Sequence, residues 1–466
     1  MKNCTITNRN TTMDTKTLRQ KILDLAIHGK LVPQDPNDEP ASVLLERIKA
    51  EKERLIKEGK IKRSKKSAKT SDTPHYPYLL PKGWKWCKLE DIVSFGGGKT
   101  PSMGNKEYWD NGKHLWVTSK DMKCSHITNS LMKITDKALV GMTLYEKGTL
   151  LVVTRSGILR HTLPLSILEK PATVNLDLKT ISPHIQELSE YLYVIIKANE
   201  HIILKEYHKD GTTVDSIDFD KFRCLPIPLA PIAEQKRIIA ETKNWLSLID
   251  QIEQGKADLQ TTIKQTKSKT LDLAIHGKLV PQHPNEEPAV ELLKRINPNF
   301  TPCDNGHYTQ LPNGWQIASM QTLCNLTDGE KQSGIERINL DVKFLRGERD
   351  AKTLTSGKYV TANSLLILVD GENSGEVFRT PIDGYQGSTF KQLRINENMN
   401  EEYVLQVINL HRKILRESKV GSAIPHLNKK LFKAIEVPIP PYKEQQKIIK
   451  AITKAFMSLD LIMESL

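Results

Sequence analysis

One glycine-rich stretch has residue types that could bind a nucleotide phosphate. Gly96-Gly-Gly-Lys99-Thr100 ends in the Gly-Lys-Thr of a phosphate-binding P-loop. That motif requires another glycine five positions before its last one, and the chain has Val93 there. The following Pro101-Ser-Met-Gly does not predict the helix whose N-terminus would face the phosphate. We therefore expect no ATP site here, and Lys99 and Thr100 become candidates for contact with the phosphate of another ligand.

Two further patterns could suggest catalysis on DNA. Ile439-Pro-Pro-Tyr442 contains the Pro-Pro-Tyr of the Asp/Asn-Pro-Pro-Tyr/Phe loop of amino-methyltransferases, but an isoleucine side chain cannot accept a hydrogen bond from the target amine. No glycine-rich cofactor loop accompanies it, so a helix start is the better interpretation. The tripeptides Asp341-Val-Lys343 and Asp350-Ala-Lys352 could be nuclease fragments, but chance supplies several in a chain with 26% charged residues. The sequence predicts no catalytic residue.

Metal binding is not predicted either. His28 and His276 each precede a glycine at the expected end of a helix, where an imidazole favours the negative end of the helix dipole. The six cysteines form no Cys-x-x-Cys pair, so they indicate neither a zinc ribbon nor a disulfide framework. A reducing cytoplasm fits this pattern best.

Two segments that follow apolar runs are better candidates for contact with DNA. Arg155-Ser-Gly-Ile-Leu-Arg160-His161 follows the run Leu150 to Val153, and Asp370-Gly-Glu-Asn373-Ser374-Gly375 stands at the matching place later in the chain. Glycine lets the backbone approach a ligand closely, while Arg, Asn and Ser can bond to base edges or phosphates. For any single residue, the alternative is a polar side chain that is exposed to solvent and contacts no ligand. The predicted DNA contacts are Lys99, Thr100, Lys120, Arg155, Ser156, Arg160, His161, Asn373, Ser374, Arg379, Lys391 and Arg394.

The composition favours a polyanionic partner such as nucleic acid. The 466 residues carry a formal net charge of +13, and the pI is about 9.2. Over half of the excess lies between Glu46 and Lys69, where eleven Lys and Arg stand against four Glu. A solvated helix and linker is the alternative interpretation of this segment. The N-terminus has no apolar segment and no run of about 18 apolar residues occurs, so neither secretion nor a membrane span is predicted.

The elements that position these residues occur in two copies. Leu23 to Gln34 returns unchanged as Leu271 to Gln282, and 21 of 26 aligned residues are identical when the match is extended to Ile48 and Ile296. Three more pairs match in the same order: Leu80 to Trp84 with Leu311 to Trp315, Leu150 to Val153 with Leu365 to Leu368, and Gly211 to Pro228 with Gly421 to Pro438. A repeat with a period of half the chain means two copies of one structural unit.

A long central helix is predicted between the copies. Pro231-Ile-Ala-Glu234-Gln235 and Pro441-Tyr-Lys-Glu444-Gln445 both suit a helix start, because proline fits the first turn and glutamate favours the positive end of the dipole. From Glu234, apolar residues recur every seven positions from Ile238 to Leu273, with Thr266 filling the one gap. The helix is predicted to run to Ile275, where His276, Gly277 and Pro281 predict its end. The predicted coiled-coil and partner-docking positions are Ile238, Trp245, Ile249, Ile252, Leu259, Ile263, Leu273, Ile448, Ile452 and Leu459.

The partners of this helix are predicted at the chain ends. The segment from Glu444 to Leu466 matches the first half of the central helix, and Thr15 to Ile27 matches the second half, so the repeat is circularly permuted. We expect an antiparallel coiled coil with a pseudo-twofold axis and a mixed α/β domain at each end. The predicted boundaries are 1–69 for an N-terminal helical segment with a basic linker, 70–232 and 298–440 for the two domains, 233–297 for the central helical spacer and 441–466 for the C-terminal helix.

Over nearly its whole length the chain resembles the specificity (S) subunits of type I restriction-modification systems. The motifs that carry the resemblance are the doubled Leu-Asp-Leu-Ala-Ile-His-Gly-Lys-Leu-Val-Pro-Gln, Leu-Pro-Lys-Gly-Trp84 with Leu-Pro-Asn-Gly-Trp315, Gly98-Lys-Thr-Pro101 with Tyr108-Trp109 and Trp116-Val-Thr-Ser-Lys-Asp121, and Pro-x-x-Glu-Gln twice. One departure is Thr327-Asp-Gly-Glu330, which lacks the Lys-Thr-Pro of the first copy, so a phosphate contact shared by both copies is not expected there.

The resemblance implies a non-catalytic protein with two target-recognition domains, each reading half of a bipartite site on double-stranded DNA. It also implies two modification (M) subunits, which methylate adenine with S-adenosylmethionine, and restriction (R) subunits, which use ATP and Mg²⁺ to translocate and cleave DNA. This chain itself would bind no cofactor. The alternatives are a self-sufficient methyltransferase or nuclease and a purely structural coiled-coil scaffold. Neither the target sequence nor its spacer can be predicted, because no code links such domains to bases.

Overall fold

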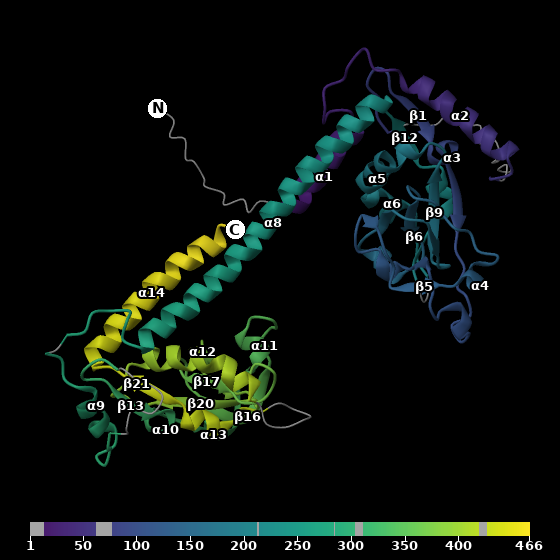
Figure 1. The fold of residues 1–466 in the computed structure, drawn as a ribbon. Helices are drawn as coiled ribbons and strands as arrows, with labels where there is room; N and C mark the ends of the chain where they lie inside the picture. Colours follow the sequence, from purple (N-terminus) through teal and green to yellow (C-terminus); the bar gives the residue numbers. More distant parts are fainter. Residues whose placement is uncertain (1–13, 62–76, 212–213, 284, 303–310, 419–425) are drawn as a thin grey trace, which may run out of the picture. The chain divides into compact units, whose positions relative to one another are not determined.

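The computed structural model describes residues 14–61, 77–211, 214–283, 285–302, 311–418 and 426–466 (Figure 1). They form two compact units, an N-terminal unit that ends at Gln254 and a C-terminal unit that runs from Gly255 to Leu466. The later part of the predicted basic segment, from residue 62 onward, lies outside the described residues. Within the described ranges, no helix is both long and apolar enough to cross a membrane.

The N-terminal unit combines helices with short strands. Its helices are α1 (Thr15–Ile27), α2 (Ala41–Lys57), α3 (Leu89–Ile92), α4 (Asp136–Leu139), α5 (Ser189–Ala198), α6 (Glu200–Glu206), α7 (Phe219–Arg223) and the first part of α8 (Ile232–Ile275), with 3-10 turns η1 (Lys106–Tyr108), η2 (Ser119–Asp121), η3 (Gly157–Arg160) and η4 (Gln186–Leu188). Its strands are β1 (Lys85–Lys88), β2 (Val93–Gly97), β3 (His114–Val117), β4 (His126–Ile127), β5 (Met132–Ile134), β6 (Leu150–Val153), β7 (Leu165–Leu168), β8 (Ala172–Val174), β9 (Leu178–Pro183), β10 (His208–Lys209), β11 (Ser216–Ile217) and β12 (Pro226–Leu229).

Two sheets form the body of the N-terminal unit. One has five strands in the order β2-β9-β6-β7-β4, and the other has three in the order β5-β3-β8. Strand β6 is buried along its whole length and pairs antiparallel with β7 and β9. Helix α5 packs on this sheet, because Tyr191, Leu192 and Ile195 share one apolar core with Leu150 and Val152 (Figure 1). The core thus fixes the end of β6, from which the first predicted contact loop begins.

The C-terminal unit has the same kinds of element with different connections. Its helices are the last part of α8, α9 (Ala289–Ile296), α10 (Met320–Leu323), α11 (Val342–Leu345), α12 (Glu401–Glu417), α13 (Lys429–Ala434) and α14 (Tyr442–Glu464). Its strands are β13 (Gln316–Ser319), β14 (Cys324–Thr327), β15 (Glu330–Leu340), β16 (Thr353–Val360), β17 (Leu365–Leu368), β18 (Val377–Arg379), β19 (Gly384–Gln386), β20 (Phe390–Ile395) and β21 (Glu436–Ile439).

A four-stranded sheet in the C-terminal unit corresponds to the larger sheet of the N-terminal unit. Its order is β14-β20-β17-β18, and the buried β17 pairs antiparallel with β18 and β20. Helix α12 covers it as α5 covers its counterpart, with Tyr403 and Val407 in one core with Leu365 and Ile367. The second sheet differs, because β15, β16 and β19 form a small closed barrel.

The sequence predicts strands at four short β-rich runs: Leu150 to Val153, Val174 to Ile181, Leu365 to Val369 and Thr389 to Ile395. Three of these are confirmed, and the run from Val174 to Ile181 is wrong as a single strand. Leu150 to Val153 is β6, and the runs beginning at Leu365 and Thr389 contain β17 and β20. The segment from Val174 to Ile181 is divided between β8 and β9, which belong to different sheets. Asn175 and Asp177 stand between them, and such residues favour turns because their side chains compete for backbone hydrogen bonds.

Both predicted helix starts are confirmed. Helix α8 begins at Ile232, directly after Pro231, and runs for 44 residues to Ile275. Helix α14 begins at Tyr442, so the Pro-Pro-Tyr motif is the start of a helix. The predicted end of α8 is also confirmed, because Gly277 adopts the left-handed backbone conformation with φ of 66°.

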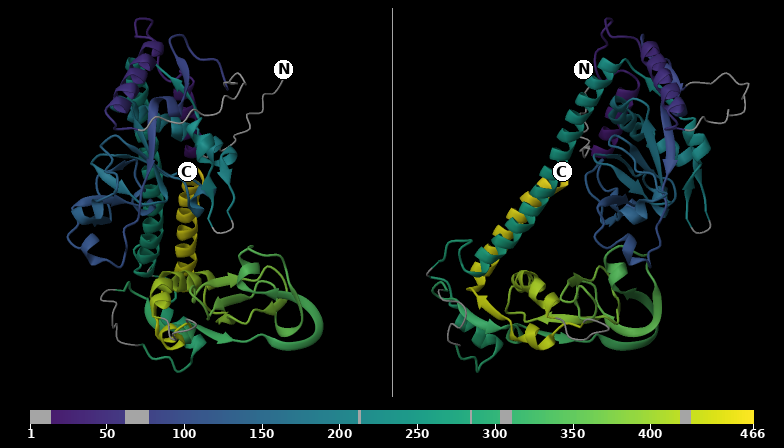
Figure 2. Two further views of the ribbon diagram at one scale, coloured as in Figure 1. Left: turned by 90° about the vertical axis from the view of Figure 1, so that its right-hand side faces the viewer. Right: turned by 45° about the vertical axis from the view of Figure 1, so that its right-hand side comes forward.

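Within each unit, one terminal helix pairs antiparallel with its part of α8 (Figures 1 and 2). In the N-terminal unit, Arg19 of α1 forms ion pairs with Asp250 and, at 2.8 Å, with Glu253 of α8. In the C-terminal unit, Lys267 of α8 lies 2.5 Å from Asp460 of α14. Mixed polar and apolar contacts therefore join each helix pair.

The predicted seven-residue seam of α8 is wrong at three positions. Ile238, Ile249 and Ile263 are buried as expected, whereas Trp245, Ile252 and Leu259 are 41%, 37% and 38% exposed. The other predicted positions divide similarly: Ile448 and Ile452 are buried, and Leu273 and Leu459 are half-buried. Ile249 and Ile263 are two seven-residue steps apart, so the repeat describes the buried row of the helix, whereas the row of Trp245, Ile252 and Leu259 is exposed.

Candidate nucleic-acid interface

A buried hydrogen bond connects each sheet unit to its long helix. Trp84 Nε1 donates to Glu234 Oε2 of α8 at 2.9 Å, and Trp315 Nε1 donates to Glu444 Oε2 of α14 at 3.1 Å. The neighbouring glutamines form equivalent hydrogen bonds, because the side-chain amide of Gln235 donates to the Ala230 carbonyl at 2.8 Å and that of Gln445 donates to the Pro440 carbonyl at 2.9 Å. Burial raises the pKa of the Glu234 and Glu444 carboxyl groups. We call this arrangement the joint. In each unit it consists of a Gly-Trp segment, which ends at Trp84 or Trp315, and a Glu-Gln helix start, which begins at Glu234 or Glu444.

The duplicated dodecapeptide supplies the other side of each joint. Gly29 and Gly277 have φ of 63° and 66°, and an added Cβ would lie 2.5 Å from Pro81 and 2.3 Å from Pro312, respectively. The preceding histidine ring lies against its own helix end, with Nδ1 of His276 2.8 Å from the Asp272 carbonyl oxygen. The histidines therefore serve the helix ends, as predicted. The identity between the two copies reflects this close packing against a Pro and a Trp.

The glycine-rich stretch around Lys99 is a close-packed loop. An added Cβ at Gly98 would lie 1.7 Å from the carbonyl oxygen of Val174 in β8. The Lys99 amide donates to that same carbonyl at 3.1 Å, and Trp116 Nε1 donates to the Lys99 carbonyl at 3.1 Å. The Lys99 ammonium donates to the Gly141 carbonyl at 2.9 Å, while Thr100 is exposed. Glycine is needed here for backbone packing, and the loop still presents a lysine at the surface.

The first predicted contact loop follows β6 and lies at the surface. Arg155, Arg160 and His161 are exposed, and Ser156 caps η3 by accepting from the Ile158 amide at 3.4 Å. Their side chains differ in the hydrogen bonds and ion pairs that they form. Arg160 forms an ion pair with Asp215, whereas the described residues supply no hydrogen bond or ion pair to the side chains of Arg155 and His161. Arg155 is thus the arginine of this loop that is available to a ligand.

The matching loop after β17 is less open than the sequence indicates. Ser374 is fully buried, so the prediction that it contacts DNA is not supported by its position. The next residue, Gly375, packs close to two leucines, since an added Cβ there would lie 3.5 Å from Leu415 and 3.9 Å from Leu427. Asn373 is half-buried, and Asp370 lies 2.6 Å from Nδ1 of His426. This loop therefore offers an acidic and a histidine side chain where the first loop offers an arginine.

The remaining predicted contacts divide into paired and exposed groups. Arg379 lies 2.6 Å from Glu401 and 2.8 Å from Glu402, and Lys391 lies 2.7 Å from Asp328. The hydrogen bond from Lys391 is the main reason that the pKa of Asp328 is lowered. By contrast, Lys120 and Arg394 are exposed and form no ion pair with the described residues. Cations already neutralised by carboxylates are weaker candidates for phosphate binding, so Arg379 and Lys391 rank below Lys120 and Arg394.

A second loop beside each predicted contact loop was missed by the sequence reasoning. Arg155 forms a β-bridge with Ser216, and Asp370 forms one with His426. Ser216 and His426 precede the short helices α7 and α13. The available signal was the match between Gly211 to Pro228 and Gly421 to Pro438, which begins at these loops.

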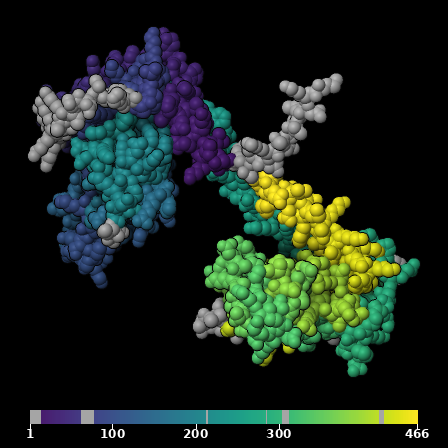
Figure 3. Space-filling view, turned by 180° about the vertical axis from the view of Figure 1, so that it is seen from behind, coloured from purple at the N-terminus to yellow at the C-terminus, as the bar shows by residue number. Residues whose placement is uncertain are grey.

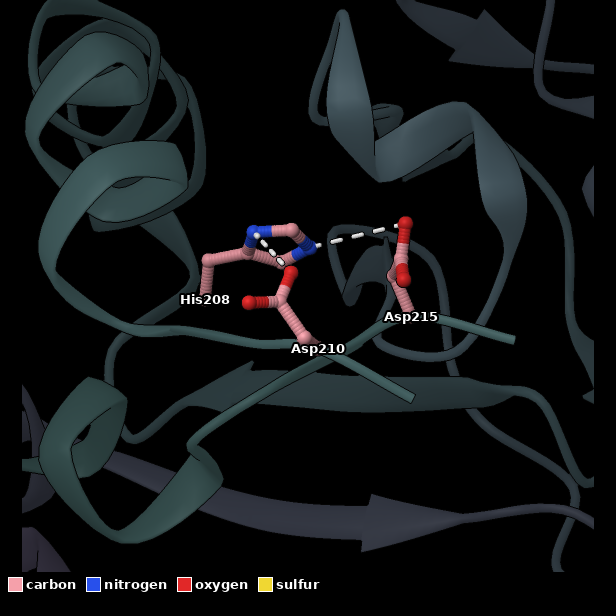
Figure 4. A group of neighbouring side chains, drawn as sticks. All are labelled: His208, Asp210 and Asp215. Carbon is pink, nitrogen blue, oxygen red and sulfur yellow. Dashed lines mark ion pairs between the residues drawn. The ribbon is translucent and has the colours of Figure 1, made fainter. Parts of the chain in front are cut away.

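His208, Asp210 and Asp215 form a cluster that has metal-ligating residue types (Figure 4). One possible ligand atom from each lies within 4.8 Å of the others. The same Asp215 oxygen that faces His208 at 3.7 Å is 2.5 Å from Arg160 Nε. A guanidinium so close to this carboxylate opposes a divalent cation, and its hydrogen bond lowers the pKa of Asp215. Ion pairing explains the cluster better than metal binding does.

Comparison with known proteins identifies the same organisation. The family model for the type I restriction modification DNA specificity domain matches residues 81–261 and 312–464. The EcoAI specificity subunit of Escherichia coli is 28% identical over 433 residues, which cover 77% of this chain and 70% of that protein. The EcoEI specificity subunit of Escherichia coli is 25% identical over 536 residues, which cover 96% of this chain and 89% of that protein.

One solved structure shares the fold at lower identity. A chain from a structure on the complex assembly and conformational transition of a type I restriction-modification system aligns with a TM-score of 0.56 and 15% identity, covering 83% of this chain and 93% of that chain. The HsdS subunit from Thermoanaerobacter tengcongensis aligns with a TM-score of 0.48 and 16% identity. The family model covers well over half of the sequence, and the chain therefore belongs to the type I restriction-modification DNA specificity family.

Proposed function

We propose that this chain is the DNA-specificity subunit of a type I restriction-modification complex. It reads a bipartite site on double-stranded DNA, with one half-site bound by each unit, and assembles with two M subunits and with R subunits. The observation that carries the proposal is the contrast between two matching joints and two unlike contact loops. Matching joints suit two identical partners, and unlike loops suit two different DNA half-sites.

The domain plan belongs to the same proposal. Residues 70–232 and 298–440 form the two target-recognition domains, and residues 233–297 form the central spacer. Residues 1–69 and 441–466 complete a circularly permuted copy of that spacer, with an antiparallel coiled coil between them. Support comes from the equivalent antiparallel pairs that α8 forms, with α1 in one unit and with α14 in the other.

The recognition surface in this proposal is cationic and exposed. Arg155, Lys99 and Lys120 supply it in the N-terminal unit, and Arg394 supplies it in the C-terminal unit. Phosphate contacts would give affinity that falls with rising salt, and base-edge contacts would give the sequence preference.

The docking surface for M subunits is proposed on the outer faces of α8 and α14. Trp245, Leu248 and Ile252 are exposed on α8, and Met457, Leu461 and Ile462 are exposed on α14. A groove of about 460 Å³ on α14 includes Met457 and Leu461, and this helix lies along the surface of its unit in Figure 3. Exposed apolar groups along a helix favour a protein partner. In this proposal, Trp245, Ile252 and Leu259 contact an M subunit, although they do not pack against a helix of this chain as the seam predicted.

Catalysis in this proposal belongs to the partners. S-adenosylmethionine, ATP and Mg²⁺ bind to M and R subunits, this chain binds none of them, and the complex acts in the cytoplasm. The specificity subunits among the relatives support this division.

Coexpression with cognate M subunits, followed by mapping of methylated adenines, tests the proposal. We expect a methylated motif with two specified halves and an unspecified spacer, and no methylation by the chain alone. Methyl transfer or cleavage by the purified chain would favour a self-sufficient enzyme. Absence of sequence-selective DNA binding with the M subunits present would favour a purely structural scaffold.

A further inference from the structure

In the N-terminal unit, backbone hydrogen bonds tie the loop after β6 to the loop before α7. The Ser156 amide donates to the Asp215 carbonyl, and the Ile217 amide donates to the Thr154 carbonyl, both at 3.0 Å. A corresponding tie exists in the C-terminal unit, where the Leu427 amide donates to the Val369 carbonyl at 2.7 Å. In both units, two segments that are distant in sequence thus form one composite surface at the end of a buried strand, β6 in the N-terminal unit and β17 in the C-terminal unit.

An ion pair locks this composite surface in the N-terminal unit. Arg160 Nε lies 2.5 Å from Asp215 Oδ2, and its Nη2 lies 3.4 Å from Oδ1. The Asp215 side chain is 0% exposed, whereas that of Arg160 is 65% exposed. A buried carboxylate without a cationic or hydrogen-bonding partner lowers the stability of the fold. Arg160 therefore serves as the partner of Asp215, and it is less available to a ligand.

The C-terminal unit uses a different pair at the same junction. Alignment of β6 with β17 makes Gly375 the counterpart of Arg160 and Asp370 the counterpart of Arg155. Alignment of the second loops makes His426 the counterpart of Ser216. The junction there is closed by Asp370 and His426, whose Oδ1 and Nδ1 atoms are 2.6 Å apart. The side-chain pair therefore occupies different positions in the two units, while backbone hydrogen bonds join the two loops in both.

We infer that Arg160 and Asp215 are a positioning pair that fixes the loop carrying Arg155 for reading one DNA half-site, and that Asp370 and His426 fix the corresponding loop for the other half-site. This inference rests on the proposed function. It assigns Arg160 a role different from direct DNA contact. Arg155, which is exposed on the fixed loop, reaches the DNA, and Arg160 acts on recognition through Asp215.

A double-mutant cycle in the complex with M subunits tests the pair. The variants are Arg160→Ala, Asp215→Ala and their combination, and the readout is methylation of DNA substrates altered in one half-site at a time. Each single change should lower discrimination at one half-site by about ten-fold, comparable to one mismatched base pair, and leave the other half-site unaffected. The combined variant should discriminate no worse than either single variant, because the two residues act as one pair and each single change already removes it.

Salt dependence separates positioning from phosphate contact. If Arg160 only positions the loop, the slope of log binding constant against log salt stays unchanged in Arg160→Ala. A slope reduced by about one, together with additive effects in the cycle, would overturn the inference and make Arg160 a phosphate ligand. If Asp215→Ala fails to assemble, Asp215→Asn keeps an acceptor for Arg160 and removes only the charge, so the cycle is run with that variant.

Two controls complete the experiment. Lys137→Ala breaks an exposed ion pair with Glu107 in the same unit, at 3.3 Å, and should change neither half-site. His426→Ala should reduce discrimination only at the half-site that Arg160→Ala spares. If the wild-type complex methylates no bipartite site, the proposed function fails. If it does so and Arg160→Ala leaves both half-sites intact, only the positioning pair fails.

Discussion

The two units of this protein agree at their joints and differ at their contact loops. In both joints a tryptophan indole donates to a buried glutamate in the first turn of a long helix, at 2.9 and 3.1 Å. At the contact loops, the N-terminal unit has the pair Arg160 and Asp215, and the C-terminal unit has Asp370 and His426. Packing against the helices therefore constrains both copies in one way, while the loops have been free to diverge.

The second sheets extend the same contrast. The N-terminal unit has a three-stranded sheet whose Trp116 meets the ring of Trp109 edge to face, with ring centroids 5.0 Å apart. The C-terminal unit has a long ribbon, β15 and β16, closed by β19, and the ring of Tyr385 occupies the space beside Gly357. The second sheets of the two units share neither their topology nor this side-chain packing. Similar architecture thus does not require similar recognition chemistry.

The strongest test of the shared joint replaces its tryptophans. Trp84→Ala and Trp315→Ala should each destabilise their own unit by about 3–5 kcal/mol, because each removes a large buried ring. Denaturant unfolding of the chain measures the loss. Trp245→Ala is the matched control, since Trp245 is 41% exposed and its removal should cost far less stability. Unequal losses at Trp84 and Trp315 would break the equivalence of the joints.

A glycine substitution should affect one unit alone. Gly98→Ala places a Cβ against the Val174 carbonyl oxygen, and overpacking of this kind costs roughly 2–3 kcal/mol. Thermal unfolding should show the loss, and methylation mapping should show weaker selectivity at a single half-site. Gly104→Ala serves as the control, because an added Cβ there meets no heavy atom within 4 Å. Wild-type stability in Gly98→Ala would contradict the close-packed loop.

Equivalent apolar positions on α8 and α14 test the two docking surfaces. Ile252 and Ile462 correspond in the repeat and are 37% and 44% exposed. Ile252→Lys or Ile462→Lys should weaken binding of one M subunit by roughly 1–2 kcal/mol, because a charge enters an apolar contact. Native mass spectrometry should then detect complexes with one M subunit in place of two. Loss of both M subunits from a single change would contradict two separate surfaces.

The smallest expected effect concerns the pH dependence of the joints. Burial raises the folded-state pKa of Glu234 and Glu444 above its unfolded value, so the folded chain binds more protons than the unfolded chain between these values. The contribution of these groups to stability is therefore present at acidic pH and is lost as pH rises through the folded pKa. Glu234→Gln with Glu444→Gln should flatten this part of the profile of unfolding free energy against pH. An unchanged profile would contradict the sign of the shift.

Much of the scaffold was predictable because its signals are local. Proline, glutamate, histidine and glycine mark the ends of α8, and the observed bounds of α1 are those inferred from the repeat. The prediction for the seam was wrong at Trp245, Ile252 and Leu259, because a seven-residue pattern does not show which of two neighbouring apolar rows packs against the partner helix. The division between β8 and β9 was missed because adjoining apolar runs do not indicate that two sheets use them.

The sequence by itself determined that this chain has two copies of one helical joint and belongs to a family of DNA-specificity proteins. Identical short motifs specify identical local packing, so a repeat can be read without coordinates. Only the tertiary structure decided which cations are available for DNA. Arg155 and Arg160 look alike in the sequence, but the partner of Arg160 is Asp215, far along the chain. Long-range folding pairs Arg160 with a carboxylate and leaves Arg155 without an ion pair among the described residues, and no local pattern encodes that choice.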